Sequence, residues 1–186
     1  MDDSQNLVQA SIQRLKAGDI GGLETLVAYF QGKAVRVAFL ITQDEPAAED
    51  IVQDTFIRIY QRIRHFDERQ PFEPYLLKSV VYAALNSRRH PTKSLDGDPT
   101  EVEALLNQSG SPETQVETSQ LSQEILAALA ELSPRQRAAI VQRYYLEMSE
   151  QEMSQALQAA PGTVKWLLHA ARARLRELLR VERSTR

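Results

Sequence analysis

The sequence predicts an all-α protein made of two small helical domains that are joined by an acidic, flexible linker. Apolar residues recur at helical spacing through most of the 186 residues. No stretch alternates apolar and polar residues for long enough to argue for a sheet. A segment rich in Pro, Gly, Ser, Thr and acidic residues interrupts the helical pattern. We therefore expect domains at 1–89 and 120–186, with the linker at 90–119.

The first domain is expected to contain four helices, at 5–16, 20–41, 46–66 and 73–89. One side of the third helix collects its large apolar residues, which are Val52, Phe56, Ile59, Ile63 and Phe66. Across from or beside them lie Asp50, Gln53 and Asp54. These polar residues either face a partner or supply the negative charge that the start of a helix favours.

Helix 73–89 is apolar on almost every side, which predicts a helix that is buried in a bundle with one narrow stripe exposed. The stripe holds Tyr75, Lys78, Ser79, Tyr82, Asn86 and Arg89. Aromatic rings stack on unpaired bases and cations hold the nucleic-acid backbone, so the stripe suits single-stranded nucleic acid. An ordinary amphipathic face with tyrosines at its rim is the alternative interpretation.

The second domain is expected to contain helices at 120–131, 134–146, 150–158 and 161–180. Two of them begin with a capping box, which pairs Ser133 with Gln136 and Ser149 with Glu152. Only a tight turn fits between the last two helices, so they are expected to form a helix-turn-helix.

The last helix has an apolar side and a basic side. The apolar side is expected to hold Val164, Leu167, Leu168, Ala171, Leu175, Leu178 and Leu179. The other side holds Lys165, Trp166, His169, Arg172, Arg176 and Arg180. Trp166 is therefore expected to be exposed, although two leucines follow it. A helix that enters the major groove by its first turn needs such side chains for base edges and phosphates. A solvated face that keeps the helix soluble is the alternative.

Composition narrows the possible function further. The chain has no cysteine, which excludes disulfides, thiolate zinc sites and cysteine nucleophiles and agrees with a reducing compartment. No apolar run approaches the length of a membrane span, and the acidic N-terminus is unlike a signal peptide, so a cytoplasmic location is expected.

Charge is distributed unevenly along the chain. Residues 1–90 hold 11 Lys/Arg and 12 Asp/Glu, a net charge of −1. Residues 91–131 hold 1 Lys/Arg and 8 Asp/Glu (−7), and residues 132–186 hold 10 Lys/Arg and 5 Asp/Glu (+5). This distribution favours polyanion binding by the C-terminal part.

Two long segments are similar to one known family. EDIVQDTFIRIYQRIRHFDERQPFEPYLLKSVVYAALNSRR resembles region 2, and LSPRQRAAIVQRYYLEMSEQEMSQALQAAPGTVKWLLHAARARLREL resembles region 4, of the extracytoplasmic-function sigma factors of bacterial RNA polymerase. The two segments have the family's order, with a linker between them. The resemblance implies a transcription initiation factor that is not an enzyme and needs no cofactor or metal. It also implies core RNA polymerase, promoter DNA and an anti-sigma factor as partners.

The resemblance implies roles for three groups of residues. Contact with the clamp coiled coil of the polymerase β′ subunit would involve Asp50, Gln53, Asp54 and Phe56. Recognition and melting of the promoter −10 element would involve Arg69, Gln70, Phe72, Tyr75, Lys78, Tyr82, Asn86 and Arg89. Reading of the −35 element as duplex would involve Thr163, Lys165, Trp166, His169, Arg172 and Arg176. Helix 134–146, with Tyr144 and Tyr145, would help to hold the β flap.

Several positions depart from the residues that are usual in the family. They are Tyr75, Tyr82, Asn86, Ala160, Trp166, Leu167 and Ala170. In the last helix, Trp166 stands where a serine is common, and Leu167 and Ala170 stand where arginines are common. The loss of two cations is expected to weaken duplex affinity and its dependence on salt. These departures bear on the promoter sequence and not on the role of the helix.

Two other classes of protein deserve comparison with this interpretation. A helix-turn-helix regulator whose first domain senses a ligand or phosphorylation would explain the second domain equally well, but not the aromatic and basic stripe. An all-α enzyme with a metal bundle would need Glu-x-x-His ligand pairs, and none of His65, His90 and His169 has a glutamate three residues before it. The sequence also lacks a Gly-rich phosphate loop and a nucleophile motif.

Overall fold

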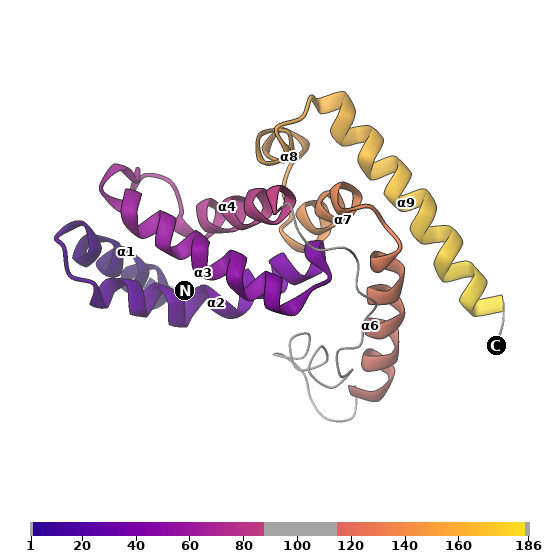
Figure 1. Cartoon of the computed structure of the whole chain (residues 1–186), viewed down its shortest axis with the longest axis horizontal. Coiled ribbons are helices and arrows are strands. Elements are labelled where there is room, and N and C mark those ends of the chain that lie inside the picture. Colours follow the sequence, from indigo (N-terminus) through magenta and orange to yellow (C-terminus); the bar gives the residue numbers. More distant parts are fainter. Residues whose placement is uncertain (1, 88–114, 185–186) are drawn as a thin grey trace.

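The computed structural model of the chain describes residues 2–87 and 115–184, and every element in these two ranges is helical (Figure 1). The first range forms α1 (Asp2–Lys16), α2 (Gly21–Thr42), α3 (Glu45–Arg62), the 3₁₀ turn η1 (Ile63–His65) and α4 (Phe72–Asn86). The second forms α6 (Gln115–Ala130), α7 (Pro134–Ile140), the π-helical η3 (Val141–Tyr145), α8 (Glu150–Leu157) and α9 (Pro161–Ser184). The prediction of an all-helical protein is confirmed.

The helices begin and end close to their predicted positions, with two kinds of difference. α6 begins at Gln115, within the range that was predicted as linker, and most of that range lies outside the described residues. α3 tightens into η1 and α7 widens into η3, where single continuous helices were predicted. The spacing of apolar residues cannot reveal these changes, because a turn that differs by one residue in its hydrogen bonding keeps nearly the same face buried.

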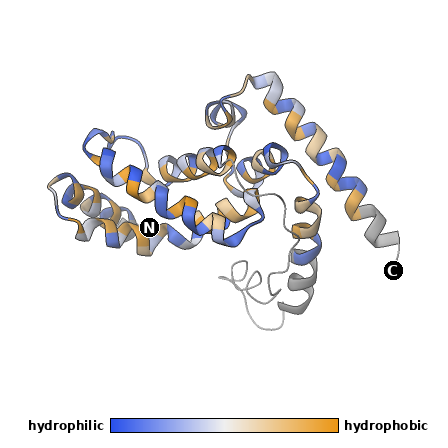
Figure 2. Ribbon diagram, in the orientation of Figure 1, coloured by the Kyte–Doolittle hydropathy of each residue, from blue (hydrophilic) through white to orange (hydrophobic). Residues whose placement is uncertain are grey.

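α2 is the central helix of the first domain, and it packs against α1, α3 and α4. Along each helix the ribbon passes repeatedly between apolar and polar residues, as amphipathic packing requires (Figure 2). Aromatic rings join α2, the end of η1 and α4: the centroid of Phe72 lies 5.6 Å from Phe30 and 5.7 Å from Phe66. The apolar side predicted for helix 46–66 is buried from Val52 to Phe66.

The second domain contains both predicted capping boxes. Ser133 caps α7 through Gln136, and Ser149 caps α8 through Glu152, with side chain and backbone bonded reciprocally in each pair. α8 ends at Gln158, whose left-handed backbone (φ 47°) turns the chain into α9. α8 and α9 pack against each other, which confirms the helix-turn-helix.

The two domains touch along α2 and α4 of the first domain and α7, η3 and α8 of the second (Figure 1). Arg137 of α7 is a buried link between them, with only 2% of the residue exposed. Its Nε donates to the carbonyl of Ile41 at 2.7 Å, and its Nη1 donates to the carbonyls of Ala130 at 3.1 Å and Leu132 at 2.8 Å. Burial lowers the pKa of the Arg137 guanidinium from its ordinary value, because loss of water disfavours the charged form.

Gly22 allows α1 and α2 to approach closely. A Cβ atom at Gly22 would overlap the carbonyl oxygen of Ser11 and lie 3.1 Å from Leu15 Cγ. A Cβ atom at Gly21 would instead meet the end of the Arg14 side chain, at 2.5 Å from its Nη2. A half-exposed arginine can move aside, whereas a helix backbone cannot.

We predict that Gly22→Ala lowers the free energy of unfolding by about 1–3 kcal/mol, because α1 must shift to accommodate the methyl group. Urea denaturation followed by circular dichroism measures this change. Gly21→Ala is the matched control, and it should change the free energy of unfolding by less than about 0.5 kcal/mol. Equal losses in both variants would show that the close helix crossing is not the cause.

Candidate nucleic-acid interface

The stripe predicted on helix 73–89 lies on α4, although its members differ in exposure. Tyr82 is 45% exposed, while Tyr75 is half-buried with its ring centroid 5.0 Å from that of Phe66. The side chain of Lys78 is one-third exposed. Asn86 is exposed, and its Nδ2 donates to the carbonyl of Tyr82 at 2.8 Å. Arg89 lies outside the described residues.

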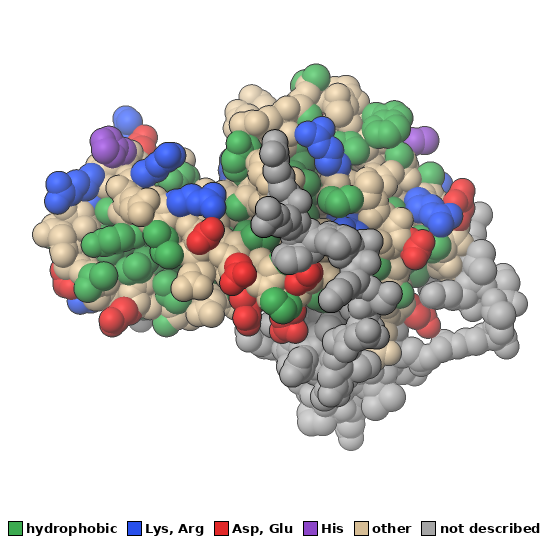
Figure 3. Space-filling view, in the orientation of Figure 1, with side chains coloured by type: hydrophobic (Ala, Val, Ile, Leu, Met, Phe, Trp, Pro, Cys, Tyr) green, Lys and Arg blue, Asp and Glu red, His purple; other side chains and the backbone are tan. Residues whose placement is uncertain are grey.

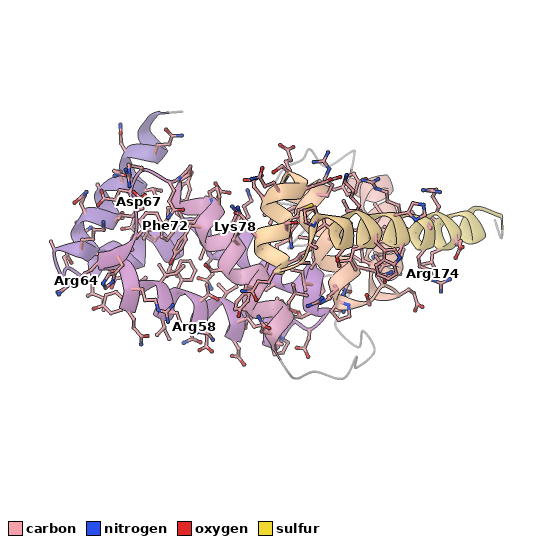
Figure 4. All side chains as sticks on the ribbon, turned by 90° about the horizontal axis from the view of Figure 1, so that it is seen from above. Arg58, Arg64, Asp67, Phe72, Lys78 and Arg174 are labelled. Carbon is pink, nitrogen blue, oxygen red and sulfur yellow. The ribbon has the colours of Figure 1, made fainter. Side chains whose placement is uncertain are left out.

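A cavity of about 500 Å³ opens beside this stripe, and three cationic side chains line it. Lys78 comes from α4, whereas Arg58 and Arg62 come from the neighbouring α3 (Figure 4). Tyr75 and Tyr82 form part of the same wall. Positive charge beside aromatic rings is the combination that binds unpaired nucleotides.

Arg58 and Arg62 were not among the residues expected from the sequence. Their four-residue spacing on the exposed side of α3 was the available signal. α3 is in fact polarised: Glu45, Glu49, Asp50 and Asp54 occupy its first part, and the arginines follow in its second. Figure 3 shows acidic side chains gathered near the middle of the molecule and Lys and Arg side chains toward its α1–α3 end. This order also agrees with the helix dipole.

The loop before α4 places its predicted DNA-binding residues in different environments. Arg69 and Gln70 are exposed, and Arg69 donates three hydrogen bonds to the Asp67 carboxylate, two from its guanidinium at 3.0 and 3.1 Å and one from its backbone N–H at 3.1 Å. These bonds lower the pKa of the Asp67 carboxyl. Phe72 was expected near a flipped base, but it is only 4% exposed and packs between Phe30 and Phe66. In this arrangement it supports the site from the core and does not present a stacking face.

The predicted polymerase-binding residues also include both exposed and buried side chains. Asp50, Gln53 and Asp54 are exposed on α3, and Asp54 pairs with Arg58 at 3.3 Å. Phe56 was expected at this surface, but it is 4% exposed and belongs to the core. It lies on the apolar side of α3 with Val52 and Ile59, as the helical period requires. Ile57 is the apolar residue beside the acids that is exposed.

α9 has the two sides that were predicted. Val164, Leu167, Leu168 and Ala171 are buried, whereas Trp166 is 64% exposed. The prediction that this tryptophan lies outside the core is therefore confirmed. The other predicted −35 residues are also exposed: Thr163, Lys165, His169, Arg172 and Arg176.

Two of the predicted −35 residues, Lys165 and Arg172, have a partner on another element. Lys165 Nζ lies 3.7 Å from a carboxylate oxygen of Glu150 at the start of α8. The guanidinium of Arg172 lies over the ring of Tyr144, 5.6 Å from its centroid. Tyr144 is itself exposed, so this pair is available at the surface. Neither contact was expected from the sequence, because only the fold brings Glu150 of α8 and Tyr144 of η3 to the side chains of α9.

The described residues contain no group of three or more His, Cys, Asp or Glu side chains that could hold a metal ion. In the same part of the chain, no helix has the length and apolar character needed to cross a membrane. The features that remain are cations, aromatic rings and amides on two helical surfaces. Side chains of these kinds bind nucleic acid.

Comparison with known proteins gives two family matches and several relatives. Residues 26–93 match the model of sigma-70 region 2, and residues 122–175 match the model of sigma-70 region 4. The chain is 31% identical over 162 residues to an RNA polymerase sigma-E factor of Streptomyces avermitilis, with 87% of each chain covered. It is 28% identical over 182 residues to the ECF RNA polymerase sigma factor SigW of Bacillus subtilis, covering 94% of this chain and 97% of SigW.

Two solved structures have a similar fold. CnrH, determined in complex with the cytosolic domain of CnrY, matches with a TM-score of 0.62 and 20% identity, covering 94% of this chain and 98% of CnrH. The sigma factor RpoE of Bartonella quintana, determined with the anti-sigma factor NepR, matches with a TM-score of 0.61 and 23% identity, covering 85% and 96% of the two chains.

Glu152 gives a pH-dependent prediction within the helix-turn-helix. Its carboxylate accepts hydrogen bonds from the backbone N–H of Ser149 at 2.9 Å and from the Ser149 hydroxyl at 2.8 Å, and these bonds lower its pKa below the ordinary value of 4.5. The stabilisation is therefore present above pH 4.5 and is lost as the pH falls through the lowered pKa. Ser149→Ala should raise the pKa of Glu152, as measured by NMR titration of its carboxyl carbon. Because alanine keeps the backbone N–H donor, an unchanged pKa would contradict the hydrogen bond from the Ser149 hydroxyl.

Proposed function

Because the chain belongs to the extracytoplasmic-function sigma factors of the sigma-70 family, which direct RNA polymerase to promoters and catalyse no reaction themselves, we propose that its two exposed nucleic-acid surfaces divide promoter recognition between them. The stripe on α4 holds the −10 element as single strand. The exposed side of α9 reads the −35 element as duplex. The observation that carries this assignment is the grouping of Tyr75, Tyr82 and three cations of the first domain around one cavity, which α8 of the second domain also lines.

The α4 surface is proposed to stabilise a melted strand by stacking and by charge. Tyr82 offers an exposed ring to a base, and Lys78, Arg58 and Arg62 offer cations to the phosphates. Because duplex DNA hides its base faces, these contacts form only after melting and therefore favour the open strand. Arg69, Gln70, Asn86 and Arg89 are proposed to extend the surface at its two ends.

The α9 surface is proposed to enter the major groove by its first turn. Thr163, Lys165 and Trp166 would lie nearest to the base edges, and the cations that follow would lie against phosphates. An indole offers one N–H donor and a large apolar face, which suits thymine methyl groups or sugars. Lys165 also lies near the carboxylate of Glu150, so a DNA phosphate would replace that exposed and weak ion pair.

The exposed first part of α3 is the proposed contact with core polymerase. Asp50, Gln53 and Asp54 are accessible there and would face the β′ clamp coiled coil, with Ile57 as the apolar member in place of the buried Phe56. Tyr144 and Tyr145 at η3 are proposed to help to hold the β flap. An anti-sigma factor is a further proposed partner, and the protein would act in the cytoplasm, where the polymerase works.

Transcription in vitro tests the promoter assignment as a whole. Core RNA polymerase supplemented with this protein should initiate from a subset of promoters in a genomic library, and sequencing of the transcripts should reveal a shared −10 and −35 pair. A control sigma factor establishes that the core enzyme is active. Initiation from no promoter under those conditions would overturn the assignment. Duplex binding without any binding to single-stranded DNA would favour a helix-turn-helix regulator instead.

Tyr82 tests the stacking role of the α4 surface. Base–aromatic stacking is worth about 1–3 kcal/mol, so Tyr82→Ala should reduce open-complex formation by roughly 5- to 100-fold. Permanganate footprinting of melted thymines measures the effect. Tyr82→Phe keeps the ring and should retain most of the activity. If Tyr82→Ala reduces duplex binding by the second domain to the same extent, the stripe has no specific role in melting.

Trp166 tests the reading of the −35 element. Trp166→Ser removes the indole and restores the small residue that is usual in the family, so the preferred −35 sequence should change. Selection of bound duplexes from a randomised −35 library, followed by sequencing, measures the preference. Glu177→Gln, at an exposed position of α9 outside the residues assigned to the −35 element, is the control for a general effect of altering this helix. An unchanged preference would show that Trp166 does not face the bases.

A further inference from the structure

A short loop separates η1 from α4 and carries two of the residues proposed to bind the −10 element, Arg69 and Gln70. Apolar packing fixes the two ends of this loop, because Phe66 and Phe72 are buried and their ring centroids lie 5.7 Å apart. Between these ends Glu68 is half-buried, whereas the other loop residues are exposed. Polar contacts of Glu68 must therefore decide where the middle of the loop lies.

Three side chains of α1 converge on Glu68. Its Oε1 accepts a hydrogen bond from Lys16 Nζ at 2.5 Å. Its Oε2 accepts from Gln9 Nε2 at 3.0 Å and also from Gln13 Nε2. The three donors are four and three residues apart, which places them on one side of α1. Lys16 Nζ also donates to the carbonyl of Phe66 at 2.8 Å, so α1 holds the loop at its start and at Glu68. We call these four side chains the α1 clamp.

The central ion pair of the α1 clamp is more enclosed than a neighbouring pair on the same helix. The side chains of Lys16 and Glu68 are 22% and 26% exposed, whereas those of Arg14 and Asp19 are both 51% exposed. Water and salt screen a partly enclosed pair less than an exposed one. α1 also precedes residues 26–93, so the match to sigma-70 region 2 does not extend to this helix.

Hydrogen bonds within the loop connect Glu68 to the residues that follow it. The backbone N–H and the guanidinium of Arg69 donate to the Asp67 carboxylate, and the N–H of Gln70 donates to the Asp67 carbonyl at 3.2 Å. The bonds from Arg69 lower the pKa of Asp67, and the charge of Lys16 lowers it further. Residues 67–70 thus form one tight turn, and holding Glu68 sets the position of the whole turn.

We propose that the α1 clamp is a set of positioning residues for base recognition: it fixes the turn that presents Arg69 and Gln70 to the melted strand, and it thereby sharpens the choice of base. A turn that is free to rearrange adapts its polar groups to different bases, whereas a fixed turn leaves the wrong base unpaired. The order of the loop is a property of the free protein. Its consequence for base choice rests on the function proposed for Arg69 and Gln70.

Backbone amide relaxation, measured by NMR on the full chain without DNA, tests the clamp. Lys16→Met removes the donor and keeps the apolar stem, and Glu68→Ala releases all three donors. In both variants the order parameters of the Arg69 and Gln70 amides should fall from about 0.85, typical of a rigid backbone, to below about 0.6. Lys16→Arg keeps a cationic donor and should keep the loop ordered.

Arg14→Met is the control for these variants. It removes a cation from the same helix, but the partner of Arg14 is Asp19 and not the loop. The order parameters of Arg69 and Gln70 should therefore stay unchanged in Arg14→Met. Unchanged order parameters in Glu68→Ala would overturn the clamp. An equal fall in Arg14→Met would also overturn it, because the cause would then be a general loosening of α1.

Selection from a random single-stranded DNA library, followed by sequencing, tests base choice. The measured quantity is the ratio of binding to the most and the least favoured base at the position where Gln70→Ala removes the preference. A polar base contact is worth about 1 kcal/mol or more, so this ratio should fall about fivefold in both Lys16→Met and Glu68→Ala. Lys16→Arg and Arg14→Met should keep the wild-type ratio.

The two clamp variants also separate positioning from simple electrostatics. Lys16→Met makes the protein more negative and Glu68→Ala makes it less negative, so a charge effect would change overall DNA affinity in opposite directions and leave the ratio unchanged. An unchanged ratio beside a disordered loop would overturn the positioning role. If wild-type protein showed no base preference, the role proposed for Arg69 and Gln70 would fail, and with it the consequence for base choice. The order parameters would still decide whether α1 holds the loop.

Discussion

The arrangement of the whole chain depends on one buried cation, the guanidinium of Arg137. Its three acceptors are carbonyl oxygens at or next to the C-terminal ends of α2 and α6, where the helix dipole supplies partial negative charge. A fixed fork of N–H donors can satisfy several such carbonyls at once, which a lysine could not do. The same side chain thereby ends α6, anchors α7 and sets the second domain against the first.

The two nucleic-acid surfaces follow from that arrangement in different ways. α9 keeps its exposed side whatever the first domain does, because its core contacts are with α6, α7 and α8. The stripe on α4 depends on the position of α8, because Lys78 faces Glu152 and Ala156 closes part of the cavity. The surface proposed to read the −35 element is therefore formed within one domain, whereas the cavity beside the stripe proposed to hold the −10 element is lined by both domains.

Sequence periodicity predicted correctly whether a residue is buried or exposed wherever the residue's own helix decides its environment. It placed Trp166 outside the core and Leu167 and Leu168 inside it, and the capping boxes at Ser133 and Ser149 marked two helix starts. It failed where the environment comes from another element. Phe72, which precedes the predicted helix 73–89, is buried by neighbouring helices, and nothing local distinguishes the internal Arg137 from the exposed Arg135 two residues before it. Contacts between the domains were beyond its reach for the same reason.

The exposed indole on α9 has a consequence for how the molecule can be observed. Trp166 is the only tryptophan of the chain, and it lies in water and not in the core. Indole emission therefore reports almost nothing about the packing of the hydrophobic interior, and a large emission shift on unfolding is not expected. It reports instead on whatever touches the recognition helix. The protein carries a native optical sensor on the surface proposed to read DNA, with no competing signal from a second indole.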